Sequence, residues 1–108
     1  MIIDLGEVKE IETVEADFLH KLGSWILIPK SMTCYTSEDN KEFKLMGKVV
    51  ILEDRSPEVK YVSYAVKSDK KVKTRYIKVH FEAVGIGPSW HYGVGYPVWF
   101  FTDEIYVY

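Results

Sequence analysis

The fold of this chain is indicated most clearly by one stretch, Val84-Gly-Ile-Gly-Pro-Ser-Trp-His-Tyr-Gly-Val-Gly-Tyr-Pro-Val-Trp-Phe-Phe101. It contains four of the seven glycines, two of the four prolines and two of the three tryptophans. Glycine and proline at this density prevent a helix or a regular strand, so a long structured loop is predicted here. A loop that carries large aromatic side chains and a histidine is usually shaped for a function.

The loop lies between two segments with strong strand patterns. In Thr74–Glu82, the apolar residues Ile77, Val79 and Phe81 alternate with polar ones, which predicts a strand with one buried face. After the loop, Val98–Tyr108 is rich in β-branched and aromatic residues, as is typical of strands.

The remainder of the chain also reads as strands and turns. The other predicted strands are Ile2–Leu5 (ended by Gly6), Val14–Phe18, Ile26–Ile28 (limited by Pro29), Ser31–Thr36 with Cys34 facing inward, Phe43–Leu52 and Lys60–Lys67. Glu53–Glu58 is predicted to be a polar loop and Ser68–Lys73 a charged hairpin-like turn. No window has a helical period. The prediction is a single all-β domain over residues 1–108, an antiparallel sandwich or barrel.

Composition and charge exclude several classes of protein. The formal net charge of the 108 residues is −2, with Lys and Arg spread among acids, which argues against nucleic-acid binding through a basic face. No apolar run is long enough to span a membrane, and the first residues lack the features of a signal peptide. Cys34 is the single cysteine, so an internal disulfide is impossible.

Several segments resemble the discoidin family, also called factor V/VIII type C or galactose-binding-like domains. The strand that ends Asp4-Leu5-Gly6 and the segment Ser31-Met-Thr-Cys-Tyr-Thr-Ser37 are similar to strands of that family. The closest resemblance is to a subgroup found C-terminal to the catalytic domain of bacterial β-N-acetylhexosaminidases, the chitobiase-like proteins. The segments that carry it run from Gly23 to Ser31 and from Pro88 to Ile105.

The resemblance implies a discoidin-like jelly roll that lacks its first strands. The family's calcium-holding loop has no counterpart in this sequence, so no metal and no cofactor are expected. A lost strand exposes a sheet edge, which favours a homodimer through that edge. The resemblance also implies a secreted or periplasmic protein.

In sugar-binding members of the family, loops at one end of the sandwich hold the ligand. An aromatic ring covers the apolar face of a sugar while polar groups bind its hydroxyls. The residues expected to form such a site are Trp90, His91, Tyr92, Tyr96, Trp25 and His20. Within this set, Trp90 or Tyr92 is the candidate stacking platform and His91 a polar contact.

Each of these residues also has a structural interpretation. For Trp25 and Trp99, which are flanked by apolar residues, packing in the core or beneath a loop is favoured over contact with a ligand. Trp90 suits either stacking on a sugar or pinning the loop to the sandwich, and for His91 a hydrogen bond to the loop backbone is favoured. Tyr92 and Tyr96 lie next to glycines and are expected to be exposed.

Catalytic and metal-binding patterns are absent from the sequence. Asp103 and Glu104 are neighbours, and neighbouring strand residues point to opposite faces, so no catalytic pair is expected there. His20, His80 and His91 lack the spacing of a zinc site. The sequence thus predicts a non-catalytic carbohydrate-binding accessory domain of a chitobiase-like glycoside hydrolase. The alternative is a structural or protein-interaction module that packs against a catalytic domain without binding sugar.

Overall fold

The structure is a computed structural model that describes residues 1–108. Its elements are β1 (Ile2–His20), the short 3-10 helix η1 (Leu22–Ser24), β2 (Ser31–Ser37), β3 (Lys44–Val50), β4 (Lys60–Glu82) and β5 (Thr102–Val107). The strands pair in the order β3-β2-β4-β1-β5, and all of these pairings are antiparallel. The predicted all-β antiparallel fold is therefore confirmed. No helix has the length and apolarity needed to cross a membrane.

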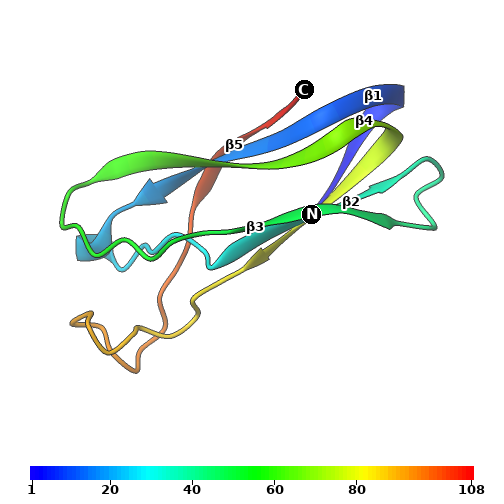
Figure 1. Cartoon of the computed structure of the whole chain (residues 1–108). Coiled ribbons are helices and arrows are strands. Elements are labelled where there is room, and N and C mark those ends of the chain that lie inside the picture. Colours follow the sequence, from blue (N-terminus) through cyan, green and yellow to red (C-terminus); the bar gives the residue numbers. More distant parts are fainter.

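The two longest strands, β1 and β4, bend so that each contributes to two layers that lie over one another (Figure 1). Residues 13–20 of β1 pair with residues 60–67 of β4, and β5 joins this pair on the far side of β1. Residues 2–4 of β1 pair with residues 76–78 of β4, and β2 and β3 continue from there. We call the first group the β5 layer and the second the β3 layer.

Gly6 lies at the bend of β1 and does not end the strand, contrary to the prediction. Its backbone has φ = +87°, a conformation that glycine adopts without strain. The pairing of β1 with β4 is interrupted between Asp4 and Lys9 and then resumes. Glycine in a strand pattern can mark such an irregularity as well as a strand end, and the sequence alone does not separate the two.

The charged run 68–73 lies at the bend of β4, so the predicted hairpin turn is wrong. The chain stays extended through it, and Val72 pairs with Ile11 of β1. Charged side chains suit an exposed bend of a continuous strand as well as they suit a turn, because both place the run in water. The bend carries the chain from the β5 layer to the β3 layer.

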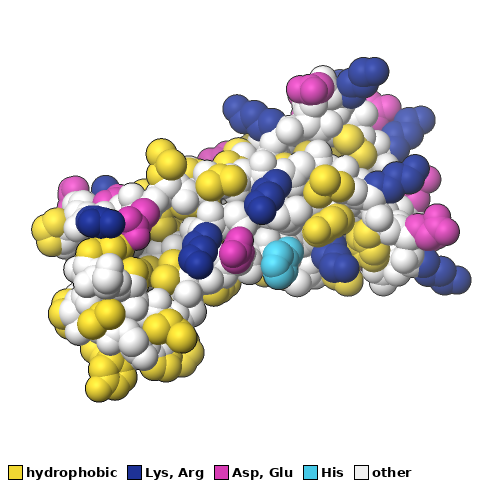
Figure 2. Space-filling model, turned by 60° about the horizontal axis from the view of Figure 1, so that its bottom comes forward, with side chains coloured by type: hydrophobic (Ala, Val, Ile, Leu, Met, Phe, Trp, Pro, Cys, Tyr) yellow, Lys and Arg dark blue, Asp and Glu magenta, His cyan; other side chains and the backbone are white.

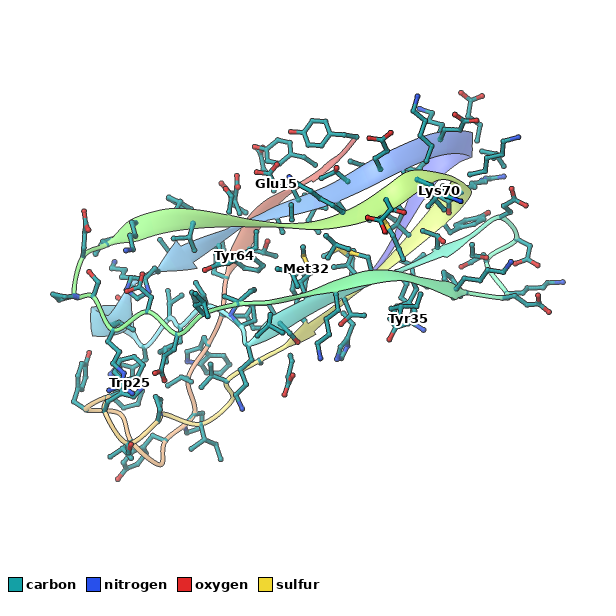
Figure 3. All side chains as sticks on the ribbon, viewed as in Figure 1. Glu15, Trp25, Met32, Tyr35, Tyr64 and Lys70 are labelled. Carbon is teal, nitrogen blue, oxygen red and sulfur yellow. The ribbon has the colours of Figure 1, made fainter.

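The core lies between the two layers and follows the predicted alternation. Val14, Ala16 and Phe18 of β1 are fully buried, and Ile77 and Val79 of β4 face the same interior. Figure 3 shows Met32 of β2 between the layers. Burial of this kind supplies most of the stabilisation of a small sandwich.

The inward prediction for Cys34 of β2 is confirmed, because its side chain is buried in the core. Burial raises the pKa of its thiol to about 11. The group is therefore a neutral thiol at physiological pH.

The predicted strand 98–108 forms only in its second half, as β5. Residues 98–101 run beside the 25–27 segment, with one bridge between Ile26 and Trp99. The predicted strand 26–28 is likewise limited to bridges of Ile26 with Trp99 and Lys21. Phe100 packs on Phe81, so the segment is fastened to the core although it is not regular strand.

Candidate functional site

The loop at residues 84–101 lies at one end of the sandwich, beside the segments 21–30 and 51–59 (Figure 1). This loop end, as we call the three segments together, gathers hydrophobic side chains, seen at the lower left of Figure 2. The prediction of a long structured loop is confirmed, because its residues form only isolated bridges before β5 begins.

The loop folds back on itself around Gly87. The backbone N–H of Gly87 donates to the carbonyl of Tyr96 (2.8 Å), and the N–H of Gly95 donates to the carbonyl of Gly87 (3.1 Å). A Cβ atom on Gly87 would lie 2.1 Å from the carbonyl oxygen of Gly93, which is impossible without movement of the backbone. Glycine at this position allows the two sides of the loop to approach closely. The hydrogen bonds between these two sides hold the loop in one shape.

Trp25 forms the centre of an aromatic cluster at the loop end (Figure 3). It has φ = +60° and is half-buried. The rings of His91, Tyr92 and Tyr96 surround it, with centroids 6.3, 5.9 and 6.1 Å from its own. Four of the six predicted site residues therefore lie together.

His91 is buried beneath this cluster, and its two ring nitrogens are both bonded to the backbone. Nδ1 accepts a hydrogen bond from the N–H of Gly93 (2.9 Å). Nε2 must then carry the proton and donate to the carbonyl of Leu22 (3.0 Å). The imidazole thus ties the loop to the η1 turn, as the structural interpretation favoured, and no nitrogen is left for a ligand.

Tyr92 is exposed, as predicted, with 66% of its surface accessible. One face of its ring is stacked on His91, at a centroid distance of 4.5 Å and an angle of 23°. Its hydroxyl donates to the carbonyl of Gly23 (2.8 Å), with the carbonyl of Leu22 at 3.2 Å. The ring is therefore fixed by the backbone at its Cβ, by the hydrogen bond of its hydroxyl, and by the stacking on His91. Tyr96 is similarly exposed, at 63%.

Trp90 packs edge-on against His91, with ring centroids 5.8 Å apart, and it is half-buried. The indole N–H donates to the carboxylate of Glu53, and the guanidinium of Arg55 lies 5.2 Å from the ring centroid. Arg55 also forms an ion pair with Glu53 (3.0 Å). The Trp90 N–H and then Arg55 hold the pKa of Glu53 below its ordinary value.

Beside Trp90 is a pocket with a volume of about 310 Å³, which we call the Trp90 pocket. Its apolar lining includes Leu27, Ile51, Val84 and Ile86, and its polar lining includes Lys30, Glu53 and Asp54. Glu53 could not be identified from the sequence as a partner of Trp90, because the two residues are 37 positions apart.

Asp54, on the rim of this pocket, is an ionised carboxylate. It forms an ion pair with Lys60 (2.8 Å), and this hydrogen bond is the main reason that its pKa lies below the ordinary value. The N–H of Ser56 also donates to Asp54 (2.8 Å). Ionised carboxylates at a pocket rim can accept hydrogen bonds from hydroxyl groups.

His20 is fully buried at the end of β1 and does not contact the aromatic cluster. Its Nε2 lies 2.6 Å from the carbonyl oxygen of Ser56 and 3.8 Å from Asp54. Its Nδ1 has no hydrogen-bond partner. His20 therefore supports the loop that forms one wall of the Trp90 pocket.

Trp99 is 68% exposed, so the prediction that it packs in the core is wrong. Its neighbours Val98 and Phe100 point inward, and alternation places Trp99 on the outside. The signal that could have identified this was the alternation itself, because Phe100 and Trp99 cannot both face the core. No cluster of His, Cys, Asp and Glu has the geometry of a metal site.

No protein-family model matches this chain, and no curated protein sequence matches it either. Among solved structures, it is similar to CBM32-1 from a family 31 glycoside hydrolase from Clostridium perfringens, with a TM-score of 0.57 and 17% sequence identity. The match covers 99% of this chain and 66% of that one, so the chain spans just under two thirds of the similar structure. The likeness confirms the predicted fold, an antiparallel β-sandwich of the jelly-roll type.

Proposed function

We propose that this chain is a non-catalytic carbohydrate-binding module of a glycoside hydrolase. The likeness to CBM32-1 supports the proposal, since that protein is a carbohydrate-binding module of such an enzyme. The resemblance of the two tryptophan-containing segments to chitobiase-like proteins supports a β-N-acetylhexosaminidase as the parent enzyme. Binding by an attached module is weak at each site, and it raises the local concentration of the enzyme near its substrate.

The observation that carries this proposal is the support given to Tyr92. A sugar presents an apolar face of C–H groups, and an exposed aromatic ring that is already immobile covers this face with little loss of entropy. The Tyr92 ring is stacked on His91 and fixed through its hydroxyl, and 66% of the residue's surface is still accessible. A tyrosine exposed for solubility alone would not need this support.

The Trp90 pocket extends the proposed site. Trp90 is immobilised by Glu53 and Arg55, and the pocket beside it combines an apolar lining with the carboxylates of Glu53 and Asp54. The His91 ring contacts both aromatic side chains, with its centroid 5.8 Å from that of Trp90 and 4.5 Å from that of Tyr92. The proposed ligand contacts are Trp90, Tyr92, Tyr96 and Trp25, with His91 and His20 as supporting residues.

The carboxylates at the loop end support a role without catalysis. Glycoside hydrolysis commonly needs one carboxylic acid that is protonated and a second carboxylate that is ionised. The pKa of Glu53 is held down by the Trp90 N–H and Arg55, and that of Asp54 by Lys60. Both groups are therefore ionised at neutral pH, and neither is suited to be the acid.

Isothermal titration with galactose, N-acetylglucosamine and chitobiose tests the proposed function. We expect at least one of these sugars to bind, with the weak affinity typical of a single shallow site. A parallel assay with a chromogenic N-acetylglucosaminide should show no release. Absence of heat with all three sugars, or turnover of the chromogenic substrate, would contradict the proposal.

A structural or protein-interaction role is the second candidate. It is favoured by the exposure of Trp99 and Phe101, which lie outside both the Trp90 pocket and the Trp25 cluster.

A further inference from the structure

The outer face of the β5 layer carries an apolar patch beside the loop end. Three exposed aromatic residues dominate it: Trp99 (68%), Tyr61 (60%) and Phe101 (48%). The half-buried Leu19 and Ile26 complete what we call the outer patch. None of these side chains lines the Trp90 pocket or joins the Trp25 cluster, so the patch is separate from the proposed sugar site.

Strand pairing brings these five residues together. Leu19 is the register partner of Tyr61 on one side, and on the other its N–H donates to the carbonyl of Phe101 (3.0 Å). Ile26 forms a bridge with Trp99. Trp99 precedes Phe101 by two residues, so both side chains lie on the same face. Residues paired across a ladder share a face, and the intervening Phe18 and Phe100 point to the core.

The chemistry of the patch fits a protein surface better than a sugar. Its polar side-chain atoms are only the Tyr61 hydroxyl and the Trp99 indole nitrogen, whereas sugar hydroxyls need several donors and acceptors. The three aromatic side chains together expose roughly 300 Å² per molecule, which is comparable to the largest apolar patch of many monomers. Exposed patches of this size and apolarity commonly form the centre of a protein interface.

One pair of charged residues at the rim of the patch, Lys21 and Asp17, is self-complementary. Lys21 is exposed and pairs with Ile26, so it borders the patch on the loop side. Asp17 borders it on the opposite side, two residues from Leu19 on the same face. If two copies meet face to face about a twofold axis, Lys21 of each copy approaches Asp17 of the other. The net charge of −2 per chain gives little repulsion between copies.

We infer that the outer patch is the contact surface of a homodimer, formed by two copies of this chain related by a twofold axis. This interface differs from the edge-strand pairing expected from the sequence. The free edges are formed by β3, which carries Lys44 and Lys48, and by β5, which carries Asp103 and Glu104. Charged side chains on edge strands oppose the addition of another strand.

Sedimentation velocity over a range of chain concentrations tests this inference. We expect the wild-type chain to dimerise, and the double variant Trp99→Ser/Phe101→Ser to be monomeric, with a dimer dissociation constant raised at least a hundredfold. Both substituted side chains are exposed, so circular dichroism should show an unchanged sheet. The matched control is Tyr92→Ser/Tyr96→Ser, which removes two exposed aromatic rings from the loop end and should leave the dimer intact.

A charge exchange separates this interface from non-specific association of apolar surface. Lys21→Glu and Asp17→Lys should each raise the dimer dissociation constant about threefold to tenfold at low salt. In the chain that carries both changes, the dissociation constant should return toward the wild-type value. A monomeric wild-type chain at all concentrations, or a dimer that persists in the Trp99→Ser/Phe101→Ser variant, overturns the inference. The inference is also overturned if the chain is monomeric and its retention on insoluble polysaccharide depends on Trp99, because the patch would then bind carbohydrate. None of these results depends on whether the Tyr92 surface binds sugar.

Discussion

The ring of Tyr92 lies on the ring of His91, with centroids 4.5 Å apart and 23° between their planes. His91 is itself held by Gly93 and Leu22, so the exposed ring of Tyr92 is supported by the backbone of two loops through one buried imidazole. Support of this kind gives an aromatic surface a fixed position before any ligand arrives.

Removal of the Tyr92 ring should weaken sugar binding more than removal of its hydroxyl. We expect Tyr92→Ala to raise the dissociation constant about tenfold, which corresponds to about 1.4 kcal/mol. Tyr92→Phe keeps the ring and should cost less, because only the hydroxyl's bonds to the carbonyls of Gly23 and Leu22 are lost. Titration calorimetry measures both. Tyr108 has a similar exposure at the other end of the chain, so equal losses in Tyr92→Ala and Tyr108→Ala would argue against a platform.

The shape of the loop should depend on Gly87. In Gly87→Ala the new Cβ would meet the carbonyl oxygen of Gly93 at 2.1 Å, so the two sides of the loop must separate. We expect sugar binding to be lost and the aromatic NMR signals of Tyr92 to move toward random-coil positions. Gly23→Ala is the control, since no atom lies within 4 Å of a Cβ at that position. Retention of binding by Gly87→Ala would show that the loop geometry is not required.

The turn after β2 should lose stability in acid through Asp39. The backbone N–H groups of Glu42 and Lys41, followed by the Ser37 hydroxyl, lower the pKa of Asp39 from 3.8 to about 2. A carboxyl whose pKa is lower in the folded state stabilises the fold above its unfolded pKa, and this contribution is lost as the pH falls from about 4 to about 2. The stability difference between the wild type and Asp39→Asn should therefore be constant above pH 4 and shrink below it. An undiminished stability difference at pH 2 would disprove this role of the Asp39 carboxylate.

Cys34 should be unreactive in the folded chain. Burial raises the pKa of its thiol to about 11, and the thiolate is the form that reacts with disulfide reagents. We expect labelling at pH 8 to proceed only at the rate of unfolding, and to be complete at once in denaturant. Labelling of the native chain that rises steeply with reagent concentration would place Cys34 at the surface.

Much of the fold follows from alternation in the sequence. The burial of Val14, Ala16 and Phe18 in β1 and of Ile77 and Val79 in β4 was predictable, because one face of a half-buried strand must be apolar. The loop end was also predictable, since the glycines and prolines between residues 84 and 101 exclude regular structure. The exposure of Tyr92 and Tyr96 next to glycines followed from the same pattern.

The layer-crossing strands and the surroundings of the Trp90 pocket were not predictable. A charged run is compatible with a turn or with a bend, and only pairing with β1 determines that residues 68–73 form a bend. The bond between Trp90 and Glu53 joins two loops that are distant in sequence and carries no local signal. Trp99 was expected in the core or beneath a loop because large aromatic residues are usually buried, but its phase relative to Phe100 places it outside.

The binding role of Tyr92 is tested most directly by following its aromatic ring signals by NMR while galactose, N-acetylglucosamine or chitobiose is added. This role predicts that at least one of these sugars shifts the Tyr92 signals in a saturable way, while those of Tyr108 stay in place. Saturable binding of a sugar that leaves the Tyr92 signals unmoved, or no binding by any of the three, would contradict it.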